Sequence, residues 1–270
     1  MIKYIFSDVD GTLIGADQIV PKNNVEMIKW ATDKGARFII LTGRVPAIIG
    51  ELLDQIELDK SDDEYYIAAN GALIMTTSGK ILYKKPLNKE KVYELAEYFM
   101  EADIDAFACV SMDAYNFLKD KTGVQYGFGE DLLSLSMDEV KERFKDADFY
   151  KMYVMTEGAS IFPELSEKIS VISEGQIRGV PSSLHNMEVF DGSTSKGKTL
   201  KIFCEMMGTN IKDALAIGDH YNDKEMLEAA GHTACPANAL DEIKAMCEYV
   251  SPYTCEEGAV ADIIKHFLSE

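Results

Sequence analysis

Residues 1–15 read MIKYIFSDVDGTLIG and place two aspartates directly after a short apolar run. The run from Ile2 to Phe6 shows little alternation of polar and apolar side chains, which is typical of a strand buried on both faces of a parallel sheet. Asp8 and Asp10 follow at once. Two unit charges about 4 Å apart repel by about 4 kcal/mol at an effective dielectric constant of about 20. Something must offset this repulsion, and the rest of the sequence should show what it is.

The segments after this strand alternate between helix and strand patterns. Residues 21–35, PKNNVEMIKWATDKG, predict a helix that begins near a proline and ends at a glycine. Residues 36–44, ARFIILTGR, predict a second buried strand, residues 46–56 a second helix, and residues 65–71, YYIAANG, a third strand. Strand–helix–strand–helix–strand is the pattern of an α/β fold with a doubly wound, Rossmann-like parallel sheet.

The pattern changes near residue 73. Residues 72–85, ALIMTTSGKILYKK, predict a β-hairpin that turns at Ser78 and Gly79. The strands and helices that follow carry no polar motif at their ends, and the strand–helix alternation resumes after residue 184. We therefore expect a core domain formed by residues 1–83 and 185–270. An inserted, mixed α/β domain is expected at residues 84–184.

Composition limits the classes of partner. The chain has 270 residues, of which 47% are hydrophobic and 27% charged, as in ordinary globular proteins. Its net charge of −19 argues against nucleic-acid binding by a basic face, because Lys and Arg supply most of that affinity. The five scattered cysteines contain no CxxC pair, which favours reduced thiols. Neither a signal-peptide pattern nor a run of about 18 apolar residues occurs, so we expect a cytoplasmic protein without membrane spans.

Polar motifs stand at several predicted strand ends. In open α/β sheets, ligands bind beyond the carboxyl ends of the strands. The motifs are SDVDGT at residues 7–12, LTGR at 41–44 and IGDHYND at 217–223, and Lys196 opens a helix within STSKGK at 193–198. We expect all four to converge on one crevice.

The carboxylates of the first and last motifs predict a site for a divalent cation. Mg²⁺ is the natural candidate, because it prefers oxygen ligands, takes few of them from protein, and binds phosphate as a further ligand. Lys196 would add a second positive charge. Gly11 would let the backbone turn sharply and present main-chain N–H groups to phosphate oxygens.

These four motifs, in this order, resemble those of the haloacid dehalogenase-like hydrolase superfamily. The resemblance covers residues 1–83 and 185–270. The runs SKGKTLKIFCEMMG at 195–208 and GDHYNDKEMLEAAG at 218–231 are similar to the Cof-type phosphatases of that superfamily, whose members carry an α/β cap where residues 84–184 lie here.

The resemblance implies a role for each motif residue. It makes Asp8 the nucleophile and a ligand of Mg²⁺, and Asp10 the general acid and base, whose backbone carbonyl also binds the metal. It makes Asp219 a further metal ligand, supported by Asp223. The residues it assigns to binding the phosphoryl group of the substrate are Val9, Thr42, Gly43, Lys196 and Asn222.

The function expected from these motifs is Mg²⁺-dependent hydrolysis of a small phosphorylated metabolite, such as a sugar phosphate or a phosphorylated cofactor, through an aspartyl-phosphate. Two alternatives stay open. A phosphohexomutase would carry an arginine-rich cap, whereas residues 84–184 contain only Arg143 and Arg178. A receiver-like module phosphorylated on Asp8 would not need Asp10. Arg44 could line the cleft or form an ion pair, and His220 is interpreted as a loop side chain.

Overall fold

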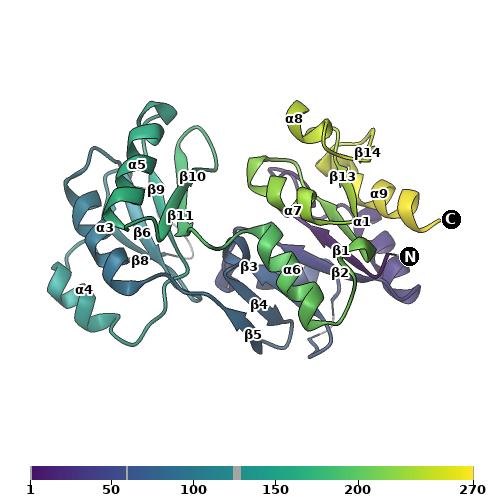
Figure 1. Cartoon of the computed structure of the whole chain (residues 1–270), viewed down its shortest axis with the longest axis horizontal. Helices are drawn as coiled ribbons and strands as arrows, with labels where there is room; N and C mark the ends of the chain where they lie inside the picture. The colour runs from purple at the N-terminus through teal and green to yellow at the C-terminus, as the bar shows by residue number, and fades with distance from the viewer. Residues whose placement is uncertain (1, 59, 124–128, 270) are drawn as a thin grey trace. The chain divides into compact units, whose positions relative to one another are not determined.

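The computed structural model describes residues 2–58, 60–123 and 129–269. The chain divides into two compact units (Figure 1). The first consists of residues 1–44, 49–84 and 195–270, and the second of residues 45–48 and 85–194.

Within the described residues, the first unit is built on an eight-stranded sheet with the order β14-β13-β12-β1-β2-β3-β4-β5. Its parallel strands are β1 (Tyr4–Ser7), β2 (Arg37–Leu41), β3 (Tyr65–Ala68), β12 (Ala214–Ile217), β13 (His232–Cys235) and β14 (Tyr249–Val250). Strands β4 (Leu73–Thr76) and β5 (Ile81–Lys84) extend this sheet as the predicted antiparallel hairpin. Since β1 lies between β12 and β2, three motif-bearing strands end side by side.

Helices flank this sheet. They are α1 (Lys22–Asp33), α2 (Gly50–Gln55), α6 (Lys196–Met206), α7 (Lys224–Ala229), α8 (Asp241–Lys244) and α9 (Ala259–Leu268). Phe203 of α6 packs edge-on against Phe6 of β1, with 5.6 Å between ring centroids. The buried Asn24 of α1 accepts a hydrogen bond from the Ala261 amide and donates one to the Leu13 carbonyl, at 2.8 and 3.3 Å. This side chain ties the loop after β1 to two helices.

Within its described residues, the second unit contains a six-stranded sheet with the order β10-β11-β9-β6-β7-β8. The strands are β6 (Ala106–Val110), β7 (Tyr115–Asp120), β8 (Gly129–Asp131), β9 (Lys151–Met155), β10 (Ile177–Pro181) and β11 (Asn186–Asp191). Helices α3 (Lys89–Glu101), α4 (Met137–Arg143) and α5 (Phe162–Ile172) pack on one face of it. Phe99 and Ile169 of these helices share a buried core with Met152 and Val189 of the sheet. The unit thus has its own hydrophobic core.

The division of the chain differs from the expected boundary at residue 184. Residues 186–191 form β11, as expected for a strand, but β11 pairs with β9 and β10 inside the second sheet. Residues 45–48 also group with the second unit, where the Ala47 amide donates to the Met112 carbonyl at 3.0 Å. The strands with which β11 pairs decide that it belongs to the second unit. A strand's own sequence does not show which strands it pairs with.

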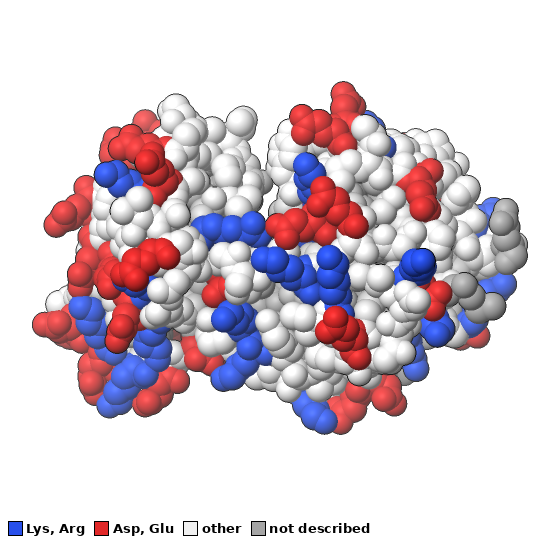
Figure 2. All heavy atoms as spheres, in the orientation of Figure 1, with Lys and Arg blue, Asp and Glu red and all other residues white. Residues whose placement is uncertain are grey.

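Acidic and basic side chains are interleaved over the visible surface of both units (Figure 2). Among the helices of the described residues, none combines the length and the hydropathy needed to cross a bilayer.

Gly197, the second residue of α6, marks a close approach between two helices. A Cβ atom at this position would lie 2.0 Å from the backbone carbonyl oxygen of Glu225 in α7. Backbone atoms cannot move aside as a flexible side chain can. The contact fixes the start of α6 against α7, and Lys196 is the neighbouring residue.

Gly197→Ala should therefore destabilise the protein by about 3 kcal/mol or more, because the added methyl group overpacks against backbone. Gly50→Ala is the matched control, since a Cβ atom at this first residue of α2 would meet no neighbouring group within 4 Å. We expect the control to stay within about 0.5 kcal/mol of the wild type. Urea unfolding monitored by circular dichroism measures both, and equal stabilities would contradict a tight contact between α6 and α7.

Candidate active site

Three parallel strands deliver polar residues to one edge of the first sheet. The Asp8 amide, directly after β1, donates to the Ile217 carbonyl at the end of β12, with 2.9 Å between N and O. On the other side of β1, the Thr42 amide after β2 donates to the Ile67 carbonyl of β3 at 3.0 Å. The first, second and fourth motifs therefore lie at adjacent strand ends, as the sequence predicts.

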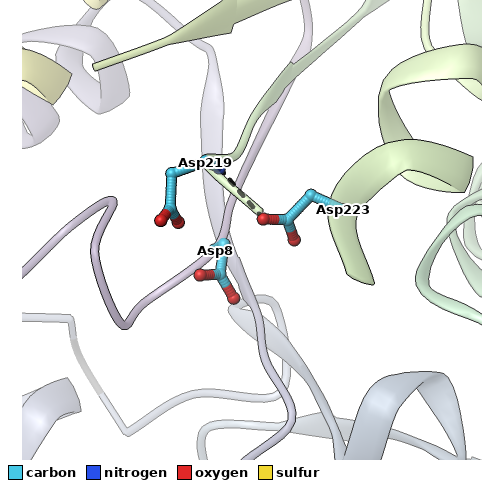
Figure 3. Close-up of side chains that lie close together, drawn as sticks. All are labelled: Asp8, Asp219 and Asp223. Carbon is cyan, nitrogen blue, oxygen red and sulfur yellow. Dashed lines mark hydrogen bonds between the residues drawn. The ribbon is translucent and has the colours of Figure 1, made fainter. Parts of the chain in front are cut away.

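Three of the predicted aspartates meet at this edge (Figure 3). Asp8, Asp219 and Asp223 each place a carboxylate oxygen within 4.8 Å of the other two. Asp8 is 5% exposed and Asp223 is fully buried. Figure 3 shows Asp8 below the other two carboxylates, with Asp219 on one side and Asp223 on the other. We call these three side chains the carboxylate cluster.

Lys196 is the cation of the cluster. It is the first residue of α6, whose N-cap Ser195 accepts a hydrogen bond from the Lys198 amide at 3.2 Å. The Lys196 side chain is 1% exposed, and its ammonium group contacts Asp8 and donates to Asp223 Oδ1 at 2.6 Å. Burial lowers the pKa of Lys196, but the carboxylates of Asp223 and Asp8 outweigh it and raise that pKa overall. The side chain is therefore a buried group paired with two carboxylates rather than a solvated residue of a first helical turn.

The 217–223 loop is held by Asp223. Its second carboxylate oxygen, Oδ2, accepts hydrogen bonds from the backbone amides of Asp219 and His220 at 3.0 and 3.2 Å. Gly218 packs against this side chain so closely that a Cβ atom would lie 2.5 Å from the Asp223 Cβ. His220 contributes its backbone to this arrangement, while its ring stacks edge-on against Tyr221. This contact fits the expectation of a loop side chain.

Thr12 and Asn238, which the sequence alone did not assign to the site, hold the Asp219 side chain and the backbone at Gly11. Thr12 donates from Oγ1 to Asp219 Oδ1 at 2.7 Å. Asn238 donates to the carbonyl oxygen of Gly11 at 2.7 Å. Gly11 has φ +84°, and a Cβ atom there would lie 2.5 Å from Asp219 Oδ2. An asparagine flanked by small residues after β13 is the signal that could have found Asn238.

Burial sets the electrostatics of the carboxylate cluster. Burial is the main cause that raises the pKa of Asp8 well above its usual range, followed by the nearby Asp223 carboxylate, while Lys196 acts in the opposite direction. Burial and then Asp223 also raise the pKa of Asp219 to about 6. Both carboxylates are held in an environment that opposes their ionised forms.

Asp10 lies apart from the carboxylate cluster. Its side chain is 54% exposed and forms an ion pair with Arg44, whose side chain is 18% exposed. Arg44 Nε donates to Asp10 Oδ2 at 2.9 Å, and a terminal guanidinium nitrogen donates to Oδ1 at 2.5 Å. Of the two alternatives for Arg44, the structure shows the ion pair, and its partner is the second aspartate of the opening stretch.

The remaining predicted residues surround these groups. Val9 and Thr42 are buried, and Thr42 Oγ1 accepts a hydrogen bond from the Arg44 amide at 3.1 Å. Gly43 follows β2 in the same turn. Asn222 is half-buried in the 3₁₀ turn Tyr221–Asp223.

The cluster has the donor set and the charge for a divalent cation. If all three carboxylates of the cluster were ionised beside the ammonium group of Lys196, the buried site would carry two uncompensated negative charges. A cation of charge +2 would neutralise them, and an all-oxygen donor set is the one that Mg²⁺ prefers. Asp10 does not enter this count, because it lies outside the cluster and pairs with Arg44.

The chain belongs to the haloacid dehalogenase-like hydrolases, since the model of that family matches residues 5–264. The phosphatase YwpJ of Bacillus subtilis (strain 168) is 26% identical over 295 residues, covering 99% of this chain and 100% of the relative. The 5-amino-6-(5-phospho-D-ribitylamino)uracil phosphatase YwtE of the same bacterium is 26% identical over 291 residues, covering 99% of each chain. The solved structure of BT1666 from Bacteroides thetaiotaomicron, a phosphatase of the haloalkanoate enzyme superfamily, matches with a TM-score of 0.83 at 22% identity, covering 99% of this chain and 95% of that one. These findings confirm the family and the α/β fold predicted from the sequence.

Asp219→Asn should stabilise the metal-free protein at neutral pH. The pKa of Asp219 is about 6 in the folded protein and 3.8 as its ordinary value, so ionising this carboxylate above pH 6 opposes folding. The neutral amide removes that penalty and still accepts the Thr12 hydrogen bond. In EDTA at pH 7.5, we expect a gain of roughly 1–3 kcal/mol that shrinks as the pH falls from about 6 towards 4.

Urea unfolding at several pH values measures this difference. The matched control is Asp146→Asn, which removes a carboxylate of the second unit outside the cluster and should stay within about 0.5 kcal/mol of the wild type at pH 7.5. A wild-type protein more stable than the Asn variant at every pH would contradict the raised pKa of Asp219.

Proposed function

We propose that the protein is a Mg²⁺-dependent phosphomonoesterase that acts through an aspartyl-phosphate on Asp8. The observation that carries this proposal is the buried contact of Asp8 with Lys196 inside the carboxylate cluster. A carboxylate that attacks a phosphate dianion needs positive charge around it, and Lys196 is held in contact with that carboxylate. Membership of a hydrolase family and relatives named as phosphatases support the same reaction class.

The proposed reaction has two steps. In the first, an Asp8 oxygen forms a bond to phosphorus while the bond from phosphorus to the leaving oxygen breaks, and Asp10, which enters this step protonated, gives its proton to that oxygen. In the second, water attacks phosphorus, the bond to Asp8 breaks, and Asp10 takes a proton from the water. Lys196 stays charged throughout and balances the negative charge around Asp8. We assign binding of the phosphoryl group to Thr42, Gly43, Asn222 and the backbone at Val9.

Asp8, Asp219 and the backbone carbonyl of Asp10 would hold Mg²⁺, with Asp223 fixing the loop that carries Asp219. The ion would supply electrostatic stabilisation of the charge that develops on the transferring phosphoryl group. Its charge would also favour the ionised form of Asp8, which burial opposes.

We infer a small phosphorylated metabolite as the substrate, either a sugar phosphate or a phosphorylated cofactor. The relative YwtE is named for a substrate that carries its phosphate on a ribityl chain, a sugar-alcohol ester. We further propose that the second unit, which contains most of the domain expected at residues 84–184, selects the substrate, since none of the residues assigned to catalysis, metal binding or phosphate binding lies inside it. Lid-like domains commonly exclude water and select substrates in enzymes of this kind.

A panel of phosphorylated metabolites and p-nitrophenyl phosphate tests the proposed function. We expect turnover with Mg²⁺, none in EDTA, and recovery when Mg²⁺ is restored. Asp8→Asn should abolish turnover with an unchanged circular dichroism spectrum, because the amide is similar in size but a poor nucleophile. Activity of this variant within tenfold of the wild type would exclude Asp8 as the nucleophile, and activity after rigorous metal removal would exclude the metal.

Asp10→Asn should separate the two proton transfers. Acid–base groups contribute roughly 10²–10⁴-fold each. An alkoxide leaving group needs the proton of the first step, whereas nitrophenolate, a weak base, hardly needs it. Rapid mixing with p-nitrophenyl phosphate should therefore give a burst of nitrophenolate near one equivalent per enzyme, followed by slow turnover. Equal losses with a sugar phosphate and the activated ester, without a burst, would make Asp10 a support for the metal instead.

A further inference from the structure

Arg44 donates two hydrogen bonds to the carboxylate of Asp10. Its Nε and one terminal nitrogen donate to different oxygens of that carboxylate, at 2.9 and 2.5 Å. Two parallel hydrogen bonds of this kind fix both the position and the plane of a carboxylate, which a single contact does not. A lysine could not reproduce them, because its ammonium group is a point charge without the planar fork of a guanidinium group.

Asp10 needs such support because burial does not restrict its side chain. Its side chain is 54% exposed, in contrast to the buried Asp8 two residues earlier. An exposed aspartate samples several rotamers, and proton transfer requires a defined one within hydrogen-bonding reach of the reacting oxygen. The hydrogen bonds from Arg44 supply this restriction.

The guanidinium group is itself held in place. Its terminal nitrogen also contacts Gln18 Oε1, and Gln18 adopts a left-handed backbone conformation with φ +61°. Such a conformation is uncommon for a residue other than glycine, and local strain of this kind often marks a functional site. The Gln55 side chain secures the same loop, donating to the Gln18 carbonyl at 3.2 Å and accepting from the Val20 amide at 2.8 Å.

The backbone of Arg44 is anchored as well. Its amide donates to Thr42 Oγ1 at 3.1 Å, and its carbonyl accepts a hydrogen bond from the Ala69 amide at 2.7 Å. Arg44 is thus fixed at the main chain by the end of β2 and at the guanidinium group by Gln18.

We propose that Arg44, supported by Gln18, is a positioning residue for Asp10 in the phosphatase reaction. This inference rests on the proposed function. It assigns to Arg44 no contact with the phosphate: Arg44 acts on both steps only through the orientation of the Asp10 carboxylate. The competing role is direct binding of the substrate phosphate by the guanidinium group.

A double-mutant cycle distinguishes these roles. Arg44→Gln alone should slow phosphoenzyme formation from a sugar phosphate by roughly 10–100-fold, part of the full contribution of an acid–base group, with KM within about threefold of the wild type. With p-nitrophenyl phosphate, the first step should change little and a burst should precede slowed turnover. In the Asp10→Asn background, Arg44→Gln should add less than about twofold, because the group it positions is already absent.

Two further variants and a control accompany the double-mutant cycle. Arg44→Lys keeps the charge but loses the fork, so it should not restore the wild-type rate. Gln18→Ala should act in the same direction as Arg44→Gln, with a smaller loss of about threefold to tenfold in line with its indirect contact. Arg37→Gln removes another arginine–carboxylate ion pair of the same unit, with Glu64, and should leave both steps unchanged. Thermal unfolding of each variant separates loss of folding from loss of rate.

The outcomes that overturn the inference are distinct from those that overturn the function. A further loss of tenfold or more on adding Arg44→Gln to Asp10→Asn would place Arg44 on the substrate. A higher KM for both substrates with unchanged kcat would do the same, and full activity of Arg44→Lys would reduce its role to charge. A wild-type protein that hydrolyses neither ester with Mg²⁺ would overturn the proposed function and the inference together.

Discussion

Two buried carboxylates, those of Asp8 and Asp223, share the buried ammonium group of Lys196, and the carboxylate of Asp219 lies beside them. Removing charged groups from water costs several kcal/mol per ion, and the attraction between them repays this only with good geometry. Apolar side chains of similar volume would often make such a region more stable. A chain that buries Asp8, Asp223 and Lys196 together therefore gains little stability from them. The proposed reaction at this site accounts for the arrangement better than folding does.

The close backbone contacts of the unit follow from the same requirement. Lys196 can reach Asp8 and Asp223 only if the start of α6 lies tightly against α7, and Gly197 allows that approach. Asp223 can cap the 217–223 loop only if residue 218 lacks a side chain. Gly11 likewise leaves room for the Asp219 carboxylate. Gly11, Gly197 and Gly218 therefore mark places where the packing around the charged groups leaves no space for a methyl group.

The sequence predicts the elements that depend on local pattern and misses those that depend on pairing. Short apolar runs followed by polar motifs identify β1, β2 and β12, and their parallel order brings Asp8, Thr42 and Asp219 to one sheet edge. The membership of β11 depends on which strands it pairs with, and nothing in residues 186–191 states that. The hydrogen bond from Asn238 to Gly11 likewise cannot be predicted from local sequence, because it joins residues distant in the chain. Contacts of this kind become visible only once the fold is built.

The repulsion between Asp8 and Asp10 is offset because each aspartate has its own cationic partner and its own environment. Asp8 is buried and contacts the buried ammonium group of Lys196. Asp10 is largely exposed and forms an ion pair with the guanidinium group of Arg44. A carboxylate screened from water is suited to attack phosphorus without being solvated. One near water and held in a fixed plane is suited to exchange protons with a leaving group and with water. Enzymes that use two acidic residues commonly assign their roles by such contrasts of environment. Here the contrast arises over two residues just after β1, whose carboxylates pair with cations on different elements, Lys196 on α6 and Arg44 after β2.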